Sequence, residues 1–227
     1  MLSFEFEHAD LLKEWKDLES KQEDGKRFYL TPEGVRYPSM TTVLQLLSAD
    51  GIAAWKARVG EEEAQKVLTR ASRRGTLIHK LCEDYVNNET IDTKSLMPSD
   101  LENFNVLKAE MDQKMGKVYG QEVALYSDHL QMAGRVDCIA EWDGKLSIID
   151  YKTSRKVKKR KNIRNYFMQA AGYAVMFEER FGVPIQQLVI LMAVDHEPNA
   201  HVFIEHRDDH VDALKELREE FRTKNGI

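Results

Sequence analysis

A change in hydrophobic period near Lys117 constrains the fold of this chain more than any other feature. From residue 118 onward the apolar residues follow a period close to two, and 118–127, 130–142 and 145–151 read as three consecutive strands. Turn-forming residues, among them Asp143-Gly144, separate these runs. The pattern predicts an antiparallel meander.

Helical spacing dominates on both sides of this meander. Upstream we expect helices over 8–23, 52–59, 61–88 and 101–115, with breaks or close approaches at Gly60 and Gly75. Within 38–47 we expect a turn followed by a short helix. Downstream we expect a helix over 165–181, a buried strand at 187–194, a strand at 201–206 and a helix over 211–222. We therefore predict one α/β domain with a mixed central sheet flanked by helices, in which 1–116 is mainly helical and 117–227 forms the mixed core.

The charge of the chain is unevenly distributed. Its 227 residues include 33 Lys and Arg against 38 Asp and Glu, a net charge of −5, which argues against a surface coated by nucleic acid. Residues 155–164, however, read RKVKKRKNIR, with seven basic residues and no acid. This basic segment indicates local contact with a polyanion, although short basic runs are also typical of solvated loops.

Cysteine content and hydropathy bear on the compartment. Cys82 and Cys138 have neither the number nor the spacing of a disulfide framework or a cysteine-based zinc site. No apolar run approaches the roughly 20 residues of a membrane span, and acids stand near the N-terminus where a targeting segment needs basic residues. We expect a soluble, cytoplasmic protein with no membrane association.

Two carboxylates are expected at the ends of adjacent strands. Asp137 lies in GRVDCIAEW, and Asp150 lies in LSIIDYKTS with Lys152 two residues further on. Because side chains alternate along a strand, Asp150 and Lys152 share a face, and a short meander brings Asp137 beside them. Such oxygen ligands suit Mg²⁺ or Mn²⁺, and a cation would offset the cost of a charge in an apolar strand. The alternative is an ordinary exposed ion pair.

Two helical pairs flank these strands. His79 and Glu83 stand four residues apart on the helix that carries RRGTLIHKLCEDYV, and Gln169 and Tyr173 stand four apart in YFMQAAGYAVMF. Each pair taken alone is more typical of a surface contact or of a buried, hydrogen-bonded side chain.

Taken in order, these stretches resemble the PD-(D/E)xK nuclease superfamily. The resemblance is to its RecB-like branch, which includes mitochondrial genome maintenance exonucleases and many phage exonucleases. It runs through YPSMTTVLQLL, GTLIH, GRVD, IIDYKTS and QAAGY, between about residues 37 and 176. One departure is Val136, which stands where the superfamily motif has proline.

The resemblance implies roles for individual residues. Asp137 and Asp150 would bind metal, with the backbone carbonyl of Tyr151 as a further ligand, and Lys152 would be the catalytic lysine. His79 would lie beside the metal. Glu83 and Glu122 are candidate additional metal ligands. Gln169 and Tyr173 would support the site or contact DNA.

The implied function is that of a DNA exonuclease that uses one or two Mg²⁺ ions, with Mn²⁺ as a substitute, to activate water. The residues expected to contact DNA phosphates are Arg73, Arg74, Arg155, Lys156, Lys158, Lys159, Arg160, Lys161 and Arg164. Helices of the first half are expected to enclose one strand, with Trp15, Tyr37 or Trp55 stacking on bases, which favours a substrate with a free end.

Other functions stay open at this point. The same fold supports a structure-selective endonuclease, or an accessory protein that binds nucleic acid without cutting it. A Mg²⁺-dependent nucleotide hydrolase is the least favoured, since the chain has no phosphate-binding G-x-x-x-x-G-K-[ST] loop. By analogy we expect a phage or bacterial enzyme of DNA recombination, repair or turnover, with any recombination or single-strand-binding partner unidentified.

Overall fold

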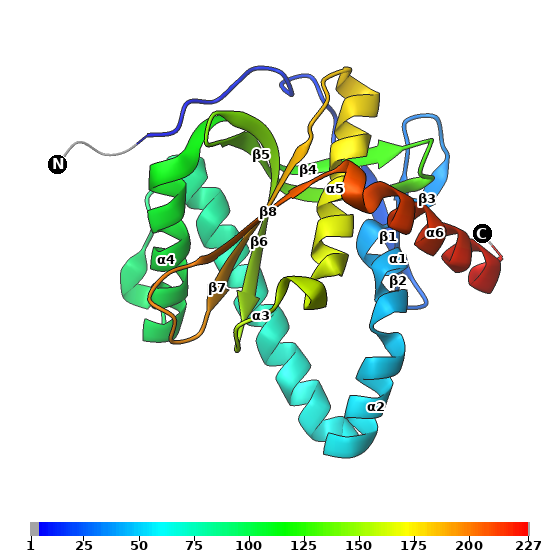
Figure 1. Cartoon of the computed structure of the whole chain (residues 1–227), viewed down its shortest axis with the longest axis horizontal. Coiled ribbons are helices and arrows are strands. Elements are labelled where there is room, and N and C mark those ends of the chain that lie inside the picture. Colours follow the sequence, from blue (N-terminus) through cyan, green and yellow to red (C-terminus); the bar gives the residue numbers. More distant parts are fainter. Residues whose placement is uncertain (1–4, 227) are drawn as a thin grey trace.

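The computed structural model describes residues 5–226, and these form two sheets with surrounding helices (Figure 1). The strands are β1 (Glu19–Glu23), β2 (Lys26–Leu30), β3 (Arg36–Pro38), β4 (Met115–Ser127), β5 (Met132–Trp142), β6 (Lys145–Ser154), β7 (Gln187–Val194) and β8 (His201–His206). The α-helices are α1 (Met40–Leu44), α2 (Ala49–Val59), α3 (Glu61–Val86), α4 (Pro98–Lys114), α5 (Arg164–Phe181) and α6 (Asp208–Asn225). Short 3-10 helices are η1 (Gln45–Leu47), η2 (Thr93–Ser95) and η3 (Arg160–Asn162).

The larger sheet has the order β4-β5-β6-β7-β8. The meander β4-β5-β6 is antiparallel, β6 and β7 are parallel, and β8 returns antiparallel to β7. The parallel step requires a crossover, which α5 provides between β6 and β7. This confirms the predicted α/β fold with a mixed central sheet flanked by helices.

Helices cover both faces of this sheet because alternate strand residues point in opposite directions. One face, with Ile148 and Ile190, packs against α1, α5 and α6. The other, with Ile149 and Leu191, packs against α3 and α4. In Figure 1, α2 and the beginning of α3 extend away from the sheet and meet at the bottom of the view. The end of α3 therefore belongs to the core, while its beginning helps to form a projecting helical hairpin.

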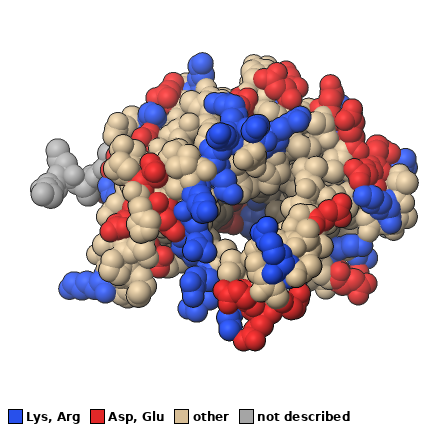
Figure 2. Space-filling model, turned by 60° about the horizontal axis from the view of Figure 1, so that its bottom comes forward, with Lys and Arg blue, Asp and Glu red and all other residues tan. Residues whose placement is uncertain are grey.

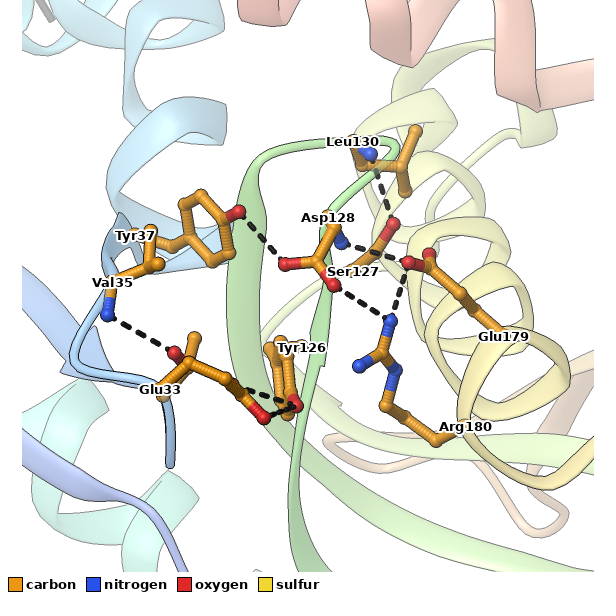
Figure 3. A network of polar contacts seen from close by, with 10 residues as sticks. Glu33, Val35, Tyr37, Tyr126, Ser127, Asp128, Leu130, Glu179 and Arg180 are labelled. Atoms are coloured by element: carbon orange, nitrogen blue, oxygen red, sulfur yellow. Dashed lines mark hydrogen bonds and ion pairs between the residues drawn. The ribbon is translucent and has the colours of Figure 1, made fainter.

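The smaller sheet, β1-β2-β3, is attached to the end of the β4-β5 hairpin through a polar network (Figure 3). The Tyr37 hydroxyl donates to Asp128 at 2.8 Å, and Arg180 of α5 donates to the same carboxylate at 2.9 Å. The Tyr126 hydroxyl donates to Glu33 at 3.2 Å. Three segments distant in sequence are thereby held together at one edge of the main sheet.

The expected helix over 8–23 is wrong. Residues 10–14 form turns, and Glu19–Glu23 is the first strand of the small sheet. The reason lies in Asp24-Gly25, where both residues have positive φ, 50° and 75°, and so form a hairpin turn between β1 and β2. The apolar spacing of this segment reflects contact with the core, since Leu18 is buried and Leu12 and Trp15 pack against buried residues.

Gly60 and Gly75 behave differently. Gly60 separates α2 from α3 with a φ of 88°, as expected of a break. Gly75 lies inside α3, which continues through it without interruption, so the expectation of a break or close approach there is wrong. Among the described residues, no helix combines the length and apolarity that crossing a membrane requires.

The helical glycines Gly172 and Gly75 should respond in opposite ways to substitution by alanine. A Cβ at Gly172 would lie 2.1 Å from Cε of Met40 and 2.9 Å from Cδ2 of Leu214, both of which are fully buried, whereas a Cβ at Gly75 would meet nothing within 4 Å. Overpacking costs about 1–3 kcal/mol and the helix propensity gain is about 1 kcal/mol. Gly172→Ala should therefore lower the free energy of unfolding by about 1 kcal/mol, and Gly75→Ala should raise it by a similar amount. Denaturant unfolding of both variants tests this, and equal effects would contradict the packing described for α5.

Candidate active site

The ends of β5 and β6 bring the two predicted carboxylates together. Cys138 pairs with Ile149, so Asp137 and Asp150 are the next residues on the two antiparallel strands. Lys152 follows Asp150 on the same face of β6, and its Nζ lies 2.5 Å from Asp150 Oδ2. The sequence prediction that these three groups form one cluster therefore agrees with the geometry.

Asp150 is the most buried of the three. Its side chain is 1% exposed, and Oδ1 has no hydrogen-bond partner among the described residues. Burial raises the pKa of Asp150 to about 6, against the opposing effect of the Lys152 charge. Burial also acts to lower the pKa of Lys152, but the charges of Asp150 and Asp137 prevail and raise it. Lys152 is therefore a cation at neutral pH, whereas the pKa of Asp150 lies only slightly below neutral pH.

Tyr166 of α5 completes the surroundings of Lys152. The centroid of its ring lies 5.0 Å from Lys152 Nζ, close enough for a cation–π interaction. Sequence analysis did not identify this residue, because an aromatic side chain near a helix N-terminus carries no signal that it will face a particular strand.

Asp137 is held in place by groups from two elements. The Tyr151 amide donates to its Oδ2 at 2.9 Å, and His79 Nδ1 of α3 lies 3.4 Å from the same oxygen. Burial acts to raise the pKa of Asp137, but His79 and Lys152 outweigh it and lower the pKa. Burial conversely acts to lower the pKa of His79, and Asp137 raises it. Asp137 is therefore the more readily ionised of the two aspartates.

Glu122 is the third acid near this centre. One donor atom each from His79, Glu122 and Asp137 lies within 4.8 Å of the others, a spacing that suits a metal ion. Burial, followed by the charge of Asp137, raises the pKa of Glu122 to about 7. Its φ of 50° lies in the left-handed region, which is strained for a residue other than glycine.

Glu83 lies further from this cluster than Glu122. It lines the same cavity and has Lys80 Nζ 3.4 Å from its Oε2, but it is outside the group of His79, Glu122 and Asp137. Direct or water-mediated metal binding by Glu83 and by the Tyr151 carbonyl stays a prediction.

These residues open into a cavity of about 850 Å³, here called the central cavity. Its walls come from the small sheet, α1, α3, the ends of β4 to β6, and α5, and include Arg27, Tyr29, Ser39, Thr41, Gln45, Ser48, Thr76, His79, Glu83, Glu122, Arg135, Asp137, Lys152, Asn165, Tyr166, Gln169 and Tyr173. Figure 2 shows a hollow on this side of the molecule with Lys and Arg side chains along its rim. His79, Glu83, Glu122 and Asp137, four of the metal-binding candidates, therefore line an open cavity with many polar side chains.

Gln169 and Tyr173 support the inner wall of this cavity. Both are buried, and Gln169 Nε2 donates to the Tyr173 hydroxyl at 3.4 Å. Tyr173 packs on Gly134 so closely that a Cβ there would lie 2.8 Å from its Cε1. This contact explains why a residue without a side chain stands at the glycine of GRVD. A direct contact of either residue with DNA stays a prediction.

The seven cations of the basic segment are all exposed after β6. Arg160 differs from the others because its NH1 donates to the Ile204 carbonyl at 3.1 Å and forms an ion pair with Glu205. Its guanidinium also lies 5.8 Å from the ring centroid of Phe203. Arg160 therefore fastens the segment to β8, while its neighbours extend into solvent.

Arg73 and Arg74 face a second hollow, of about 1470 Å³, on the other side of α3. Arg74 NH1 donates to both carboxylate oxygens of Asp195, at 2.6 and 2.8 Å, and Asn103 donates to the same group at 3.2 Å. Arg74 thus ties α3 to the end of β7. Because Asp195 already pairs with Arg74, Arg73 is the more available of the two arginines for binding an anion from solution.

The aromatic residues expected to stack on bases have other contacts. Trp15 Nε1 donates to the Ala124 carbonyl at 2.8 Å, and its ring packs against Tyr126 and Phe181. Tyr37 belongs to the network around Asp128. Packing and hydrogen bonding account for both, and stacking by Trp55 stays a prediction.

The donor set fits a hard divalent cation. The group of His79, Glu122 and Asp137 does not include Asp150, whose buried Oδ1 has no partner among the described residues. An unpartnered buried carboxylate oxygen is costly unless a cation binds to it. Neither Cys82 nor Cys138 belongs to the cluster, so its ligands are oxygen and nitrogen atoms. The residues present therefore fit a divalent ion, with the Lys152 ammonium close to Asp150.

A strand-helix core with such a centre defines a class of metal-dependent nucleases, and sequence comparison agrees. A sequence model of the PD-(D/E)XK nuclease superfamily matches residues 100–226, which is more than half of the chain and includes Asp137, Asp150 and Lys152. The chain therefore belongs to this superfamily, whose members generally use divalent metal ions.

Among individual proteins, the chain is similar to mitochondrial genome maintenance exonuclease 1. The human protein is 27% identical over 175 residues, which cover 71% of this chain and 45% of the human protein. The mouse protein is 27% identical over 180 residues, covering 72% and 52%. The chain spans about half the length of the curated relatives it matches. The relatives' name places them in mitochondria, and a cytoplasmic location for this chain stays a prediction.

Among solved structures, the crystal structure of SSO0001 matches 81% of this chain and 75% of its own chain. The TM-score is 0.42 and the sequence identity is 15%.

Metal binding should depend on pH in the range set by the two raised carboxyl pKa values. Protons compete with the cation for Asp150, with a pKa of about 6, and for Glu122, with a pKa of about 7. Below these values both acids are protonated, and His79, whose pKa is also raised, competes for a proton as well, so affinity for Mn²⁺ should rise with pH from about 5 by roughly tenfold per unit for each proton displaced, and level off only once His79 is neutral. Calorimetric titration with Mn²⁺ at several pH values measures this.

Substitutions distinguish the contributions of Glu122 and Asp150 to metal affinity. Glu122→Gln should remove the part of the pH dependence near 7, and Asp150→Asn should abolish tight binding. Circular dichroism at each pH confirms that the protein is folded. Affinity that is independent of pH, or equal in both variants and the natural protein, would contradict the assigned ligands.

Proposed function

We propose that this chain is a DNA exonuclease that hydrolyses phosphodiester bonds with Mg²⁺, for which Mn²⁺ can substitute. The observation that carries this proposal is the juxtaposition of Asp137, Asp150 and Lys152, of which Asp137 and Lys152 line the central cavity and Asp150 lies buried beside Lys152, in a chain of the PD-(D/E)XK superfamily. The name of the similar exonucleases supports the choice of DNA as substrate and of exonucleolytic cleavage.

The proposed chemistry needs one cofactor. Bound Mg²⁺ would polarise the scissile phosphate and lower the pKa of a water molecule, so that hydroxide is available near neutral pH. Asp137 and Asp150 would hold the ion, with Glu122 and His79 as further ligands. His79 and the Tyr151 amide fix the orientation of the Asp137 carboxylate.

Lys152 contributes positive charge at the reacting phosphate. Its raised pKa keeps the ammonium protonated at neutral pH, so it stabilises the charge that develops on the phosphate oxygens rather than accepting a proton. The nearby Asp150 carboxylate and the Tyr166 ring restrict where the ammonium can lie. A neutral residue at this position removes the charge and leaves Asp150 buried without a partner.

The form of the cavity favours a single strand with a free end. Helices α1, α3 and α5, the small sheet and the ends of β4 to β6 line it. A strand that reaches the metal site would pass between these elements, and a linear molecule can do so by its end. A closed circle has no end to insert.

The basic segment supplies contacts that do not depend on base sequence. It begins directly after β6, three residues beyond Lys152, and its cations would contact phosphates that flank the cleaved bond. Arg160 acts by positioning the segment on β8, and the remaining cations act on the DNA. We place this activity in DNA recombination, repair or turnover, as part of the same proposal.

The first test compares end-labelled linear single-stranded DNA with a covalently closed circle of the same sequence. The natural protein should degrade the linear strand in Mg²⁺ and not in EDTA, and should leave the circle intact. Lys152→Ala should lose essentially all cleavage because the charge at the phosphate is gone. Product analysis on denaturing gels measures both.

Two results would contradict the proposal, and each would support a specific alternative. Cleavage of the circle would establish an endonuclease on the same fold. Binding without cleavage, unchanged in Lys152→Ala, would establish an accessory protein that binds nucleic acid.

A second test concerns salt. Each phosphate contact on a single strand contributes about 0.7 to the slope of log affinity against log salt. Lys158, Lys159 and Lys161 are exposed and form no ion pair among the described residues, so replacing all three by glutamine should reduce the slope by about 2. Fluorescence anisotropy of a labelled single strand in EDTA, at several salt concentrations, measures the slope.

Lys13, Lys21 and Lys215 provide the matched control. They are also exposed and lie outside the basic segment and the central cavity, Lys13 and Lys21 in surface ion pairs with Asp10 and Glu19. The triple glutamine variant at these positions carries the same change in net charge and should retain the natural slope. If the two triple variants behave alike, the basic segment has no specific part in binding.

A further inference from the structure

The small sheet contributes one cation to the central cavity that neither the sequence motifs nor the superfamily match includes. This cation is Arg27 on β2, which lies outside the matched residues 100–226. Its side chain is exposed and lines the cavity beside the buried Tyr29. The three-stranded sheet therefore has a role in the cavity besides its attachment to β4 and β5.

The backbone of Arg27 is fixed by three hydrogen bonds to the beginning of α1. Its amide donates to Thr42 Oγ1 at 2.9 Å, and its carbonyl accepts from the Ser39 amide at 2.8 Å and from the Thr42 hydroxyl at 3.3 Å. Ser39 and Thr42 are themselves buried. Because these hydrogen bonds fix the backbone of Arg27, only its side chain must be ordered on binding, which lowers the entropic cost.

Other cations in the same wall are already paired. Arg135 donates to both carboxylate oxygens of Asp17 at 2.7 Å and also to the Glu122 carbonyl. Lys80 Nζ lies 2.7 Å from Asp84. Among the described residues, Arg27 forms no ion pair with an acid, so its guanidinium is available to an anion that enters the cavity.

The position of Arg27 relative to the basic segment follows from the sheet order. The small sheet packs beside β5, with Ser39 bridging Ala133, whereas the basic segment follows β6 and is fastened to β8 by Arg160. Since the order is β5-β6-β7-β8, Lys152 on β6 lies between them. A strand crossing the cavity from one side to the other passes the metal-binding candidates on the way.

The wall next to Arg27 suits a nucleic-acid backbone. Thr41, Gln45 and Ser48 line it from α1 and the turn that follows, and all three are exposed, uncharged and able to donate hydrogen bonds. A guanidinium among neutral donors matches the phosphate and sugar oxygens of a strand.

We propose that Arg27 binds a backbone phosphate of the substrate strand on the side of the cleavage centre opposite to the basic segment. This inference rests on the proposed nuclease function and extends it. The strand is then held on both sides of the bond that is cut, by exposed lysines on one side and by a backbone-anchored arginine on the other.

The test uses Arg27→Ala and Arg27→Lys with Arg36→Ala as the matched control. Arg36 lies on β3 of the same sheet, outside the cavity, where it pairs with Glu23 at 2.6 Å and covers the Phe28 ring. Binding of a labelled single strand is measured in EDTA at several salt concentrations, and KM and kcat are measured in Mg²⁺. Thermal unfolding verifies that the variants are folded.

Arg27→Ala should weaken binding about tenfold and reduce the salt slope by about 0.7, as the loss of one phosphate contact requires. KM should rise with little change in kcat, because this contact is the same in the ground and transition states. Arg27→Lys should retain the slope, and Arg36→Ala should match the natural protein.

The outcomes distinguish this inference from the proposed function. If the natural protein cuts DNA but Arg27→Ala has the same slope and KM as Arg36→Ala, the phosphate site is overturned and the nuclease remains. If the natural protein does not cut, the proposed function fails. The binding slope then still shows whether Arg27 contacts the strand.

Discussion

The ion pair between Asp150 and Lys152 is the constraint on which the rest of the structure depends. An ionised carboxylate on a strand buried on both faces costs several kcal/mol in lost hydration, and only a close cation offsets that cost. Lys152 Nζ at 2.5 Å supplies part of the compensation, and an unpartnered Oδ1 remains. The fold thereby keeps an unpartnered carboxylate oxygen in a low-dielectric setting, where electrostatic attraction for a divalent ion is strong.

Burial of this pair requires helices on both sides, and the same helices form the cavity. Helix α3 contributes His79 to the metal-binding candidates and Thr76 to the cavity wall, while Arg74 one turn earlier fixes it to Asp195. Helix α5 brings Tyr166 onto Lys152 and packs Tyr173 against Gly134. The elements that hold the candidate centre therefore also form the cavity through which a substrate would reach it, so the proposed catalysis and the proposed access of the strand depend on the same helices.

The sequence was sufficient for the sheet and for the two aspartates, because strand alternation and turn residues are local signals. Strands β7 and β8 have the bounds expected from their apolar runs. The sequence alone was insufficient where long-range contacts determine the local structure. The segment 8–23 has helical spacing but forms turns and β1, because its apolar residues pack on distant strands. Likewise, no local pattern distinguishes Arg160, which Glu205 holds, from the lysines beside it.

The net charge of −5 fits this arrangement when the pairing of each cation is considered. Many lysines and arginines are matched by acids on their own helices or across short contacts, as Lys66 is by Glu62 and Arg135 by Asp17. Cations without such partners among the described residues include those of the basic segment other than Arg160, and Arg27 in the cavity. Because surface ion pairs contribute little field at a distance, the attraction for a polyanion is concentrated where cations are unpaired. Under the proposed function, an acidic protein would thereby bind a strand at its cavity, while the rest of its surface would repel it.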